Sequence, residues 1–117
     1  VVSNPKAARG LGGGGTIHHL AFATPNDATQ LEVREKLLTK GLQVTPVLDR
    51  QYFHSIYFRE PGGILFEIAT NPPGFAIDEQ PAKLGEALKL PAWYEPSHKK
   101  IEQGLKPIQL QTDKFMD

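Results

Sequence analysis

The segment from Ser55 to Ile68 constrains the fold of this chain more than any other. Its sequence, SIYFREPGGILFEI, predicts two apolar strands joined by a tight turn at Pro61-Gly62-Gly63, because proline and glycine supply the backbone angles that turns need. The second strand carries one carboxylate, Glu67, between apolar neighbours. Burial of an unpaired charge is costly. The hairpin therefore predicts a partner for Glu67 elsewhere in the fold.

Candidate partners lie upstream, in an apolar strand predicted over residues 16–23, which carries His18 and His19. Imidazole and carboxylate groups on apolar strands suggest a metal site that faces a cavity. From the residues alone, a histidine in such a strand is more often a hydrogen-bonded core residue than a ligand. Glu67 could equally pair with Arg59 across the hairpin. Both interpretations stay open at this point.

Composition excludes several classes of function. The chain has 117 residues, enough for one domain, with 13 basic and 13 acidic side chains, so no excess charge favours nucleic acid or a membrane surface as a partner. The absence of cysteine excludes disulfide scaffolds, thiolate metal sites and cysteine nucleophiles. No apolar run approaches the roughly 20 residues of a membrane span. No targeting segment is visible, and we expect a cytoplasmic location.

Hydrophobic periodicity predicts an α+β fold built on one β-α-β-β-β module. Residues 1–15 end in four glycines and predict a flexible linker. Residues 16–75 hold the module, and residues 76–117 form an extension with short helices and a tail. The expected elements are strands over residues 16–23, 43–48, 52–59 and 64–70, a helix over 27–40, and short helices over 82–90 and 97–105.

The helix expected over residues 27–40 is amphipathic, and one such helix covers only one face of a four-stranded sheet. The other face is left bare. We therefore expect the module to pair with a second one, in the same protein or in another copy of the chain. The apolar positions of the helix recur at helical spacing between charged residues: Ala28, Leu31, Leu38 and the pair Val33/Leu37.

These elements resemble one module of the vicinal oxygen chelate superfamily, which includes glyoxalase I, bleomycin-resistance proteins and extradiol ring-cleaving dioxygenases. The resemblance covers roughly residues 15–105. The string from Asp49 to Gly63, followed by Phe66–Thr70, is similar to the C-terminal module of bacterial hydroquinone- and catechol-type ring-cleaving dioxygenases. It implies half of an extradiol dioxygenase, whose partners are an aromatic substrate, dioxygen and a second βαβββ module.

The resemblance also implies roles for individual residues. His19, which precedes Leu20-Ala21-Phe22, matches the family's histidine ligand, and Glu67 matches its glutamate ligand. They would supply two ligands of a 2-His-1-carboxylate site on Fe(II), with Mn(II), Zn(II) or Ni(II) as alternatives. Tyr57, ten residues before Glu67, matches the tyrosine that hydrogen-bonds a substrate oxygen. His18 is expected to be structural or to support the site, because neighbouring strand residues face opposite ways.

The sequence departs from the family pattern in two places. The second histidine ligand would come from a first module that this sequence does not contain. The family's catalytic histidine falls on Leu48. Arg50 and His54 are the nearby candidates for substrate contacts, Arg50 for an anionic group, although His54 is opposite Tyr57 in strand parity.

Two other functions stay open. A glyoxalase-like lyase or isomerase could form from two copies of the chain, with redox-inert Zn(II) or Ni(II) in place of iron. A metal-free binding module of the bleomycin-resistance type would hold a planar ligand in a dimer groove. Dependence on dioxygen separates the dioxygenase from the first alternative, and a ligand held without metal would identify the second.

Overall fold

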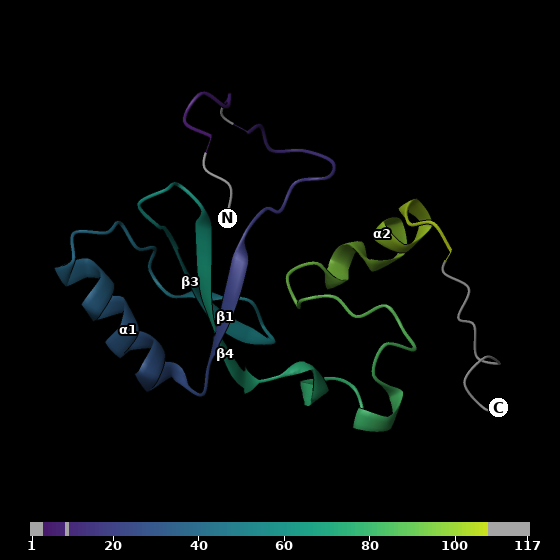
Figure 1. The fold of residues 1–117 in the computed structure, drawn as a ribbon. Helices are drawn as coiled ribbons and strands as arrows, with labels where there is room; N and C mark the ends of the chain where they lie inside the picture. The colour runs from purple at the N-terminus through teal and green to yellow at the C-terminus, as the bar shows by residue number, and fades with distance from the viewer. Residues whose placement is uncertain (1–3, 9, 108–117) are drawn as a thin grey trace, which may run out of the picture. The chain divides into compact units, whose positions relative to one another are not determined.

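The structure is a computed structural model that describes residues 4–8 and 10–107. The chain divides into two compact units, and the division falls between Gly74 and Phe75. The first unit contains a sheet and one long helix (Figure 1). Its elements in chain order are β1 (Leu20–Thr24), α1 (Asp27–Thr39), β2 (Leu48–Asp49), β3 (Phe53–Arg59) and β4 (Leu65–Pro73).

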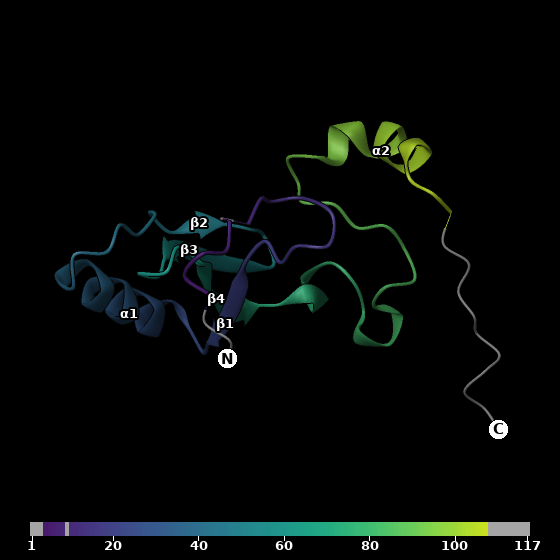
Figure 2. The same cartoon turned by 45° about the horizontal axis from the view of Figure 1, so that its top comes forward.

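The four strands form one sheet in the order β1-β4-β3-β2. β1 runs parallel to β4, whereas β3 is antiparallel to both β4 and β2. Helix α1 contacts β1, β3 and β4, and the turned view shows it on one side of the sheet, with β2 beside β3 (Figure 2). The predicted β-α-β-β-β order and the α+β class are confirmed.

The register of the strands places Glu67 at the middle of the sheet. Glu67 of β4 pairs with Tyr57 of β3 on one side and with Ala21 of β1 on the other. Ile56 and Phe58 are buried and, by strand alternation, face away from the side that carries Glu67. The apolar core and the carboxylate therefore occupy opposite faces of one sheet.

The face of α1 that packs on the sheet agrees with the predicted one only at Val33 and Leu37, which are half-buried. Ala28, Leu31 and Leu38 are exposed, so the expectation that they face the sheet is wrong. The inward stripe still has helical spacing, but half of it is polar. It consists of Gln30, Val33, Arg34 and Leu37.

Backbone carbonyls that need donors explain the polar half of this stripe. Gln30 is completely buried, and its Nε2 donates to the carbonyl oxygens of His54 (2.9 Å) and Ile68 (2.8 Å). The register of β3 against β4 shifts between Phe53 and Ser55, beside this contact. A buried carbonyl without a donor is costly, so a glutamine is more favourable here than an apolar residue.

The strand predicted over residues 43–48 is largely wrong. Val44 makes one isolated bridge with Phe58, and β2 begins only at Leu48. Pro46 interrupts the pairing because proline has no N–H to donate. The hydroxyl of Thr45 accepts from the N–H of Tyr57 at 3.0 Å, in place of a backbone carbonyl.

β1 also begins later than predicted, at Leu20 rather than at residue 16. Its pairing starts at Leu20 with Phe66, close to the point where β4 itself begins at Leu65. Residues 16–19 therefore have no β-ladder partner on β4. His18 and His19 lie just before the strand and not within it.

The second unit contains short helical segments. These are η1 (Phe75–Ile77), η2 (Pro81–Lys83), η3 (Glu95–Ser97) and α2 (His98–Gly104). The helix predicted over residues 97–105 is confirmed as α2. The helix predicted over 82–90 is wrong, because Gly85 adopts a positive φ of 84° that ends any helix there.

Other sequence predictions fall partly outside the described residues, namely the linker at residues 1–3 and 9 and the tail at 108–117. The described part of the linker has turns and no helix or strand. Among the described residues, no helix is long and apolar enough to cross a membrane.

The β3–β4 turn is stabilised by a carboxylate. Glu60 accepts from the N–H groups of Gly62 and Ile64, each at 2.8 Å, and these two backbone hydrogen bonds lower the pKa of Glu60 below 4.5. Gly63 has a φ of 91°, which favours glycine at this position. The turn predicted from Pro61-Gly62-Gly63 is thus confirmed, with Glu60 as an additional element.

We predict that Gln30→Leu lowers the free energy of unfolding by about 2 kcal/mol, because leucine has similar size but removes the donor that Gln30 supplies to the part-buried carbonyls of His54 and Ile68. Urea unfolding followed by circular dichroism measures the change. Gln103→Leu, on an exposed position of α2, is the matched control and should have a much smaller effect. Equal stability of the Gln30 variant and the wild type would contradict the role assigned to Gln30.

We predict that Glu60 makes the folded state more stable above pH 4.5 than in stronger acid. Its pKa is lower in the folded chain than in the unfolded one, so the stabilisation is lost as the pH falls through the folded pKa. The difference in free energy of unfolding between wild type and Glu60→Gln should therefore shrink as the pH is lowered below 4.5. Denaturant unfolding at several pH values tests this, and a difference independent of pH would refute it.

Candidate functional site

The carboxylate of Glu67 is the centre of a polar cluster on the face of the sheet opposite α1. The residue is only 4% exposed. Its Oε1 atom accepts from hydroxyl groups of β3, and its Oε2 atom lies 2.8 Å from Nε2 of His19. The partner that the sequence demands is therefore present. It is His19, and the alternative pairing with Arg59 is not seen.

Two side chains of β3 hold the Oε1 atom. The hydroxyl of Tyr57 donates to it at 2.8 Å, and the hydroxyl of Ser55 donates to the same atom. Ser55 and Tyr57 are two positions apart on one strand, so both side chains point to the same face. Ser55 was not singled out from the sequence. Its parity with Tyr57, and the antiparallel hairpin that brings both beside Glu67, are the signals that could have identified it.

His19 and Glu67 are suitably placed to share a metal ion. Their nearest atoms, Nε2 and Oε2, are 2.8 Å apart. Two metal bonds of about 2.1 Å at a right angle place the donor atoms about 3.0 Å apart, so the side chains would need to move little. Within residues 4–8 and 10–107, no third histidine, aspartate or glutamate joins them as a potential ligand.

His18 lies against the far side of the His19 ring. The Nδ1 atoms of the two residues are 2.9 Å apart, and their rings meet edge to face. One of the two nitrogens must carry the hydrogen in such a contact. A hydrogen-bonded outer nitrogen fixes the orientation of an imidazole whose inner nitrogen is free to bind a metal. This placement agrees with a supporting position for His18.

Arg50 lies over the ring of Tyr57. Its guanidinium carbon is 5.5 Å from the ring centroid, and Nη2 is 3.4 Å from the Tyr57 hydroxyl. A tight turn after β2 sets this position, since Asp49 accepts from the N–H of Gln51, which has a positive φ of 65°. A cation thus borders the cluster at Tyr57. The sequence-based candidates His19, Glu67, Tyr57 and Arg50 are brought together.

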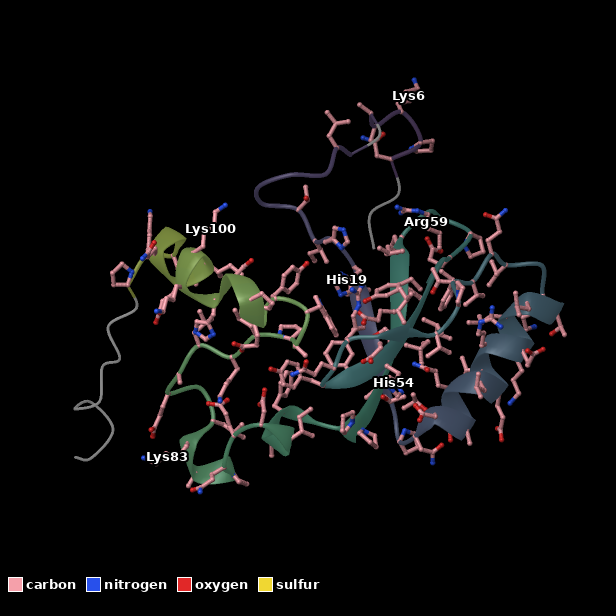
Figure 3. The ribbon with its side chains drawn as sticks, turned by 180° about the vertical axis from the view of Figure 1, so that it is seen from behind. Lys6, His19, His54, Arg59, Lys83 and Lys100 are labelled. Carbon is pink, nitrogen blue, oxygen red and sulfur yellow. The ribbon has the colours of Figure 1, made fainter. Side chains whose placement is uncertain are left out.

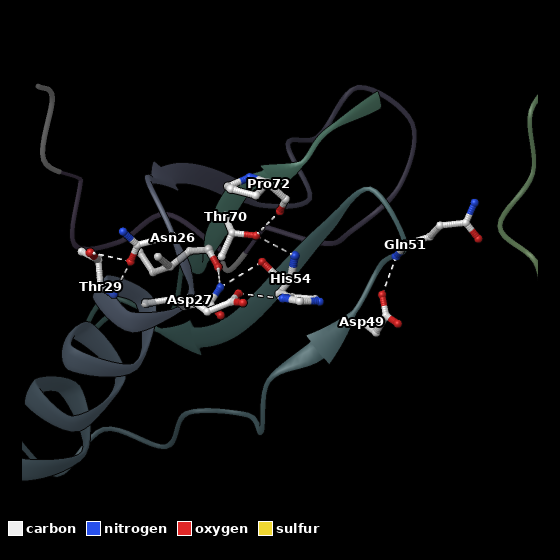
Figure 4. Close-up of polar contacts among 10 residues, drawn as sticks. Asn26, Asp27, Thr29, Asp49, Gln51, His54, Thr70 and Pro72 are labelled. Carbon is white, nitrogen blue, oxygen red and sulfur yellow. Dashed lines mark hydrogen bonds and ion pairs between the residues drawn. The ribbon is translucent and has the colours of Figure 1, made fainter. Parts of the chain in front are cut away.

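His54 is not part of this cluster. Its Nδ1 contacts Oδ1 of Asp27, the first residue of α1, at 2.7 Å, so its side chain lies on the helix side of the sheet (Figure 4). Figure 3 shows His19 and His54 at separate places. Strand alternation gives the reason, because His54 precedes Ser55 and must point the other way.

Two more residues weighed from the sequence have other surroundings. Arg59 donates to the carbonyl of Gly63 at 2.8 Å and lies near the turn (Figure 3). Leu48 pairs with Ser55 across β2 and β3 and supplies no group that can exchange a proton. A hollow of about 560 Å³ adjoins Tyr57 and Arg59, but its lining includes neither His19 nor Glu67. We therefore take the polar cluster around Glu67, and not this hollow, as the candidate site.

Comparison with known proteins identifies the family of the chain. The family described as the Glyoxalase/Bleomycin resistance protein/Dioxygenase superfamily matches residues 2–68, more than half of the chain. A solved structure of a "putative dioxygenase" from Bacillus subtilis superposes with a TM-score of 0.77 at 54% identity. It covers 81% of this chain, and the chain covers 31% of it.

Curated relatives carry related names. "Putative ring-cleaving dioxygenase MhqO" of Bacillus subtilis is 53% identical over 102 residues, which are 87% of this chain and 33% of that protein. The chlorohydroquinone/hydroquinone 1,2-dioxygenase of Sphingobium indicum is 43% identical over 83 residues, 67% of this chain and 24% of that protein. The chain thus spans a third or less of the length of these relatives. It belongs to the glyoxalase/bleomycin resistance protein/dioxygenase superfamily.

Proposed function

We propose that this chain is part of an Fe(II)-dependent extradiol dioxygenase that cleaves a hydroquinone- or catechol-like ring. The contact between Nε2 of His19 and Oε2 of Glu67 at 2.8 Å is the observation that carries the proposal. The relatives named as ring-cleaving dioxygenases, one of them a hydroquinone dioxygenase, support the reaction class.

In this proposal His19 and Glu67 are two of the three protein ligands. One histidine and one carboxylate from this chain leave one histidine of a 2-His-1-carboxylate site to be supplied from elsewhere. Fe(II) suits this ligand set and the dioxygen chemistry of the named relatives, with Mn(II), Zn(II) or Ni(II) as alternatives. When bound, the metal would chelate the substrate oxygens and bring dioxygen beside the activated ring.

Tyr57 would hold a substrate oxygen. Its hydroxyl is 2.8 Å from Oε1 of Glu67, and its side chain is only half-buried, so a small rotation could exchange the carboxylate for a substrate. Arg50 would favour an anionic substrate oxygen on the same side, because its guanidinium is close to the Tyr57 hydroxyl. Tyr57 and Arg50 would orient the substrate ring, while the carboxylate of Glu67 stays directed toward the metal.

A second βαβββ module would complete the site. The chain spans 33% of MhqO and 24% of the hydroquinone dioxygenase, which leaves room for another module in proteins of that length. β1 is an edge strand, and its Leu20 and Phe22 are 44% and 48% exposed. Apolar side chains on an unpaired edge favour coverage by another part of the protein or by a second copy.

The test uses the full-length protein that carries this chain, prepared without oxygen and loaded with Fe(II). Loss of a residue that only hydrogen-bonds a metal ligand costs roughly 10–100-fold in metal affinity or activity. His19 and Glu67 are the proposed ligands themselves, so His19→Ala and Glu67→Gln should each lower ring cleavage by more than about 100-fold and lower the amount of bound iron. Metal analysis and oxygen uptake with a hydroquinone measure both effects.

The second unit offers matched controls for this experiment. His98 and Glu95 contact one another at 3.1 Å in a partly exposed pair of α2 and η3, so His98→Ala and Glu95→Gln should keep metal and activity. Retention of iron and ring cleavage by both site variants would overturn the proposal. Turnover without oxygen uptake would instead favour an isomerase or lyase.

A further inference from the structure

Ser55 is the one completely buried hydroxyl residue that touches the carboxylate of Glu67 in the described part of the chain. Its side chain points into the polar cluster, and its hydroxyl donates to Oε1 of Glu67. A buried serine in a strand often only fills space. Here its single donor is committed to the residue that would bind the metal.

The two oxygens of Glu67 have different surroundings. Oε1 receives the hydroxyls of Ser55 and Tyr57, whereas Oε2 faces Nε2 of His19. Hydrogen bonds to a carboxylate oxygen are directional and strong when the acceptor is charged. Both donors therefore favour the rotation of the carboxylate that directs Oε2 toward His19.

The two donors differ in their freedom to leave. Tyr57 is half-buried, lies beside Arg50 and is the group proposed to bind the substrate. Ser55 has no exposed surface and a short side chain with one rotatable bond. When the Tyr57 hydroxyl turns to a substrate oxygen, Ser55 remains as the donor that keeps Glu67 in place.

The backbone of β3 next to Ser55 is fixed from the other face of the sheet. The N–H of His54 donates to Oγ1 of Thr70 at 2.9 Å (Figure 4). The carbonyl of His54 accepts from Nε2 of Gln30 at 2.9 Å. The imidazole of His54 also contacts Asp27 at the start of α1. Residue 54 is thus held at three points, which limits the movement of Ser55 toward or away from Glu67.

We propose that Ser55 is a positioning residue of the metal site: it holds Oε1 of Glu67 so that Oε2 stays directed toward His19, also when Tyr57 binds the substrate. This rests on the proposed function, in which His19 and Glu67 are ligands. Ser55 does not bind metal or substrate itself. Its effect is on the affinity of the site for the metal.

A matched pair of variants separates the effect of the Ser55 hydroxyl from the effect of side-chain volume. Ser55→Thr and Ser55→Val have nearly the same shape, and β-branched side chains are well accepted in strands, but only threonine keeps the hydroxyl. In the full-length protein, the dissociation constant for Co(II) is measured by competition with a chelator. Ser55→Val should raise it about tenfold, as for other partners of metal ligands, and Ser55→Thr should stay close to the wild type.

A further variant separates positioning from general stability. Thr24 is 4% exposed at the end of β1, and its buried hydroxyl has no hydrogen-bond partner in the described part of the chain, Glu67 included. Thr24→Ser, which removes only a buried methyl group, should lower the melting temperature without raising the Co(II) dissociation constant. Thermal unfolding of all three variants in the metal-free state shows whether a change in affinity follows a change in stability.

Each outcome bears on the proposal. A Co(II) dissociation constant that is raised by valine and restored by threonine supports it. Equal Co(II) dissociation constants for Ser55→Thr and Ser55→Val overturn it. In that case the proposed function still stands if the wild type binds Co(II) and Glu67→Gln does not. If the wild type binds no Co(II), or binds it equally well without His19 and Glu67, the proposed function fails and the role of Ser55 fails with it.

Discussion

The burial of one carboxylate in the middle of a sheet is the constraint on which the site depends. Glu67 is 4% exposed, and a charge so far removed from water is stable only when its oxygens receive hydrogen bonds or a cation. Three groups from two other segments meet this need: Ser55 and Tyr57 from β3, and His19 from the residues before β1. The proposed metal ion would meet the same requirement, since a cation between Oε2 of Glu67 and Nε2 of His19 would replace their direct contact.

The two faces of the sheet have separate tasks, and β3 contributes residues to both. On the helix side, buried Gln30 binds carbonyls of both β3 and β4, and apolar residues such as Ile56 and Phe58 form the core. On the other side, Ser55 and Tyr57 reach the carboxylate. Strand alternation connects these tasks, because any shift of β3 against β4 by one residue would exchange the two faces.

Much of the architecture could be predicted from the sequence, and the errors have physical reasons. The order of elements follows from periodicity and from strong turn signals such as Pro61-Gly62-Gly63. The orientation of α1 could not be predicted from apolar spacing, because Gln30 is buried to serve carbonyls that become visible only in three dimensions. The short β2 reflects Pro46 and the hydroxyl of Thr45, whose bond to the Tyr57 backbone is likewise tertiary.

Part of the candidate site could be predicted from strand parity and from the family resemblance. His19, Glu67, Tyr57 and Arg50 lie together as expected, while parity alone separates His54 from them. Ser55 was not recognised, although it shares the strand parity of Tyr57, because a serine in a strand draws no attention until its neighbour across the sheet is known. The contact between His18 and His19 also required coordinates, since both residues lie outside the paired part of β1.

The position of Glu67 between a hairpin partner and a parallel partner has a consequence for the order in which the site assembles. Ser55 and Tyr57 are only 12 and 10 residues from Glu67 in the chain, so the hairpin can bring them to the carboxylate through short loop closure. His19 arrives only when β1 pairs in parallel with β4, which requires α1 to cross between them. We therefore expect the histidine contact to form late in folding. Occupancy of the site by a cation would then report that the whole module, and not the hairpin alone, has formed.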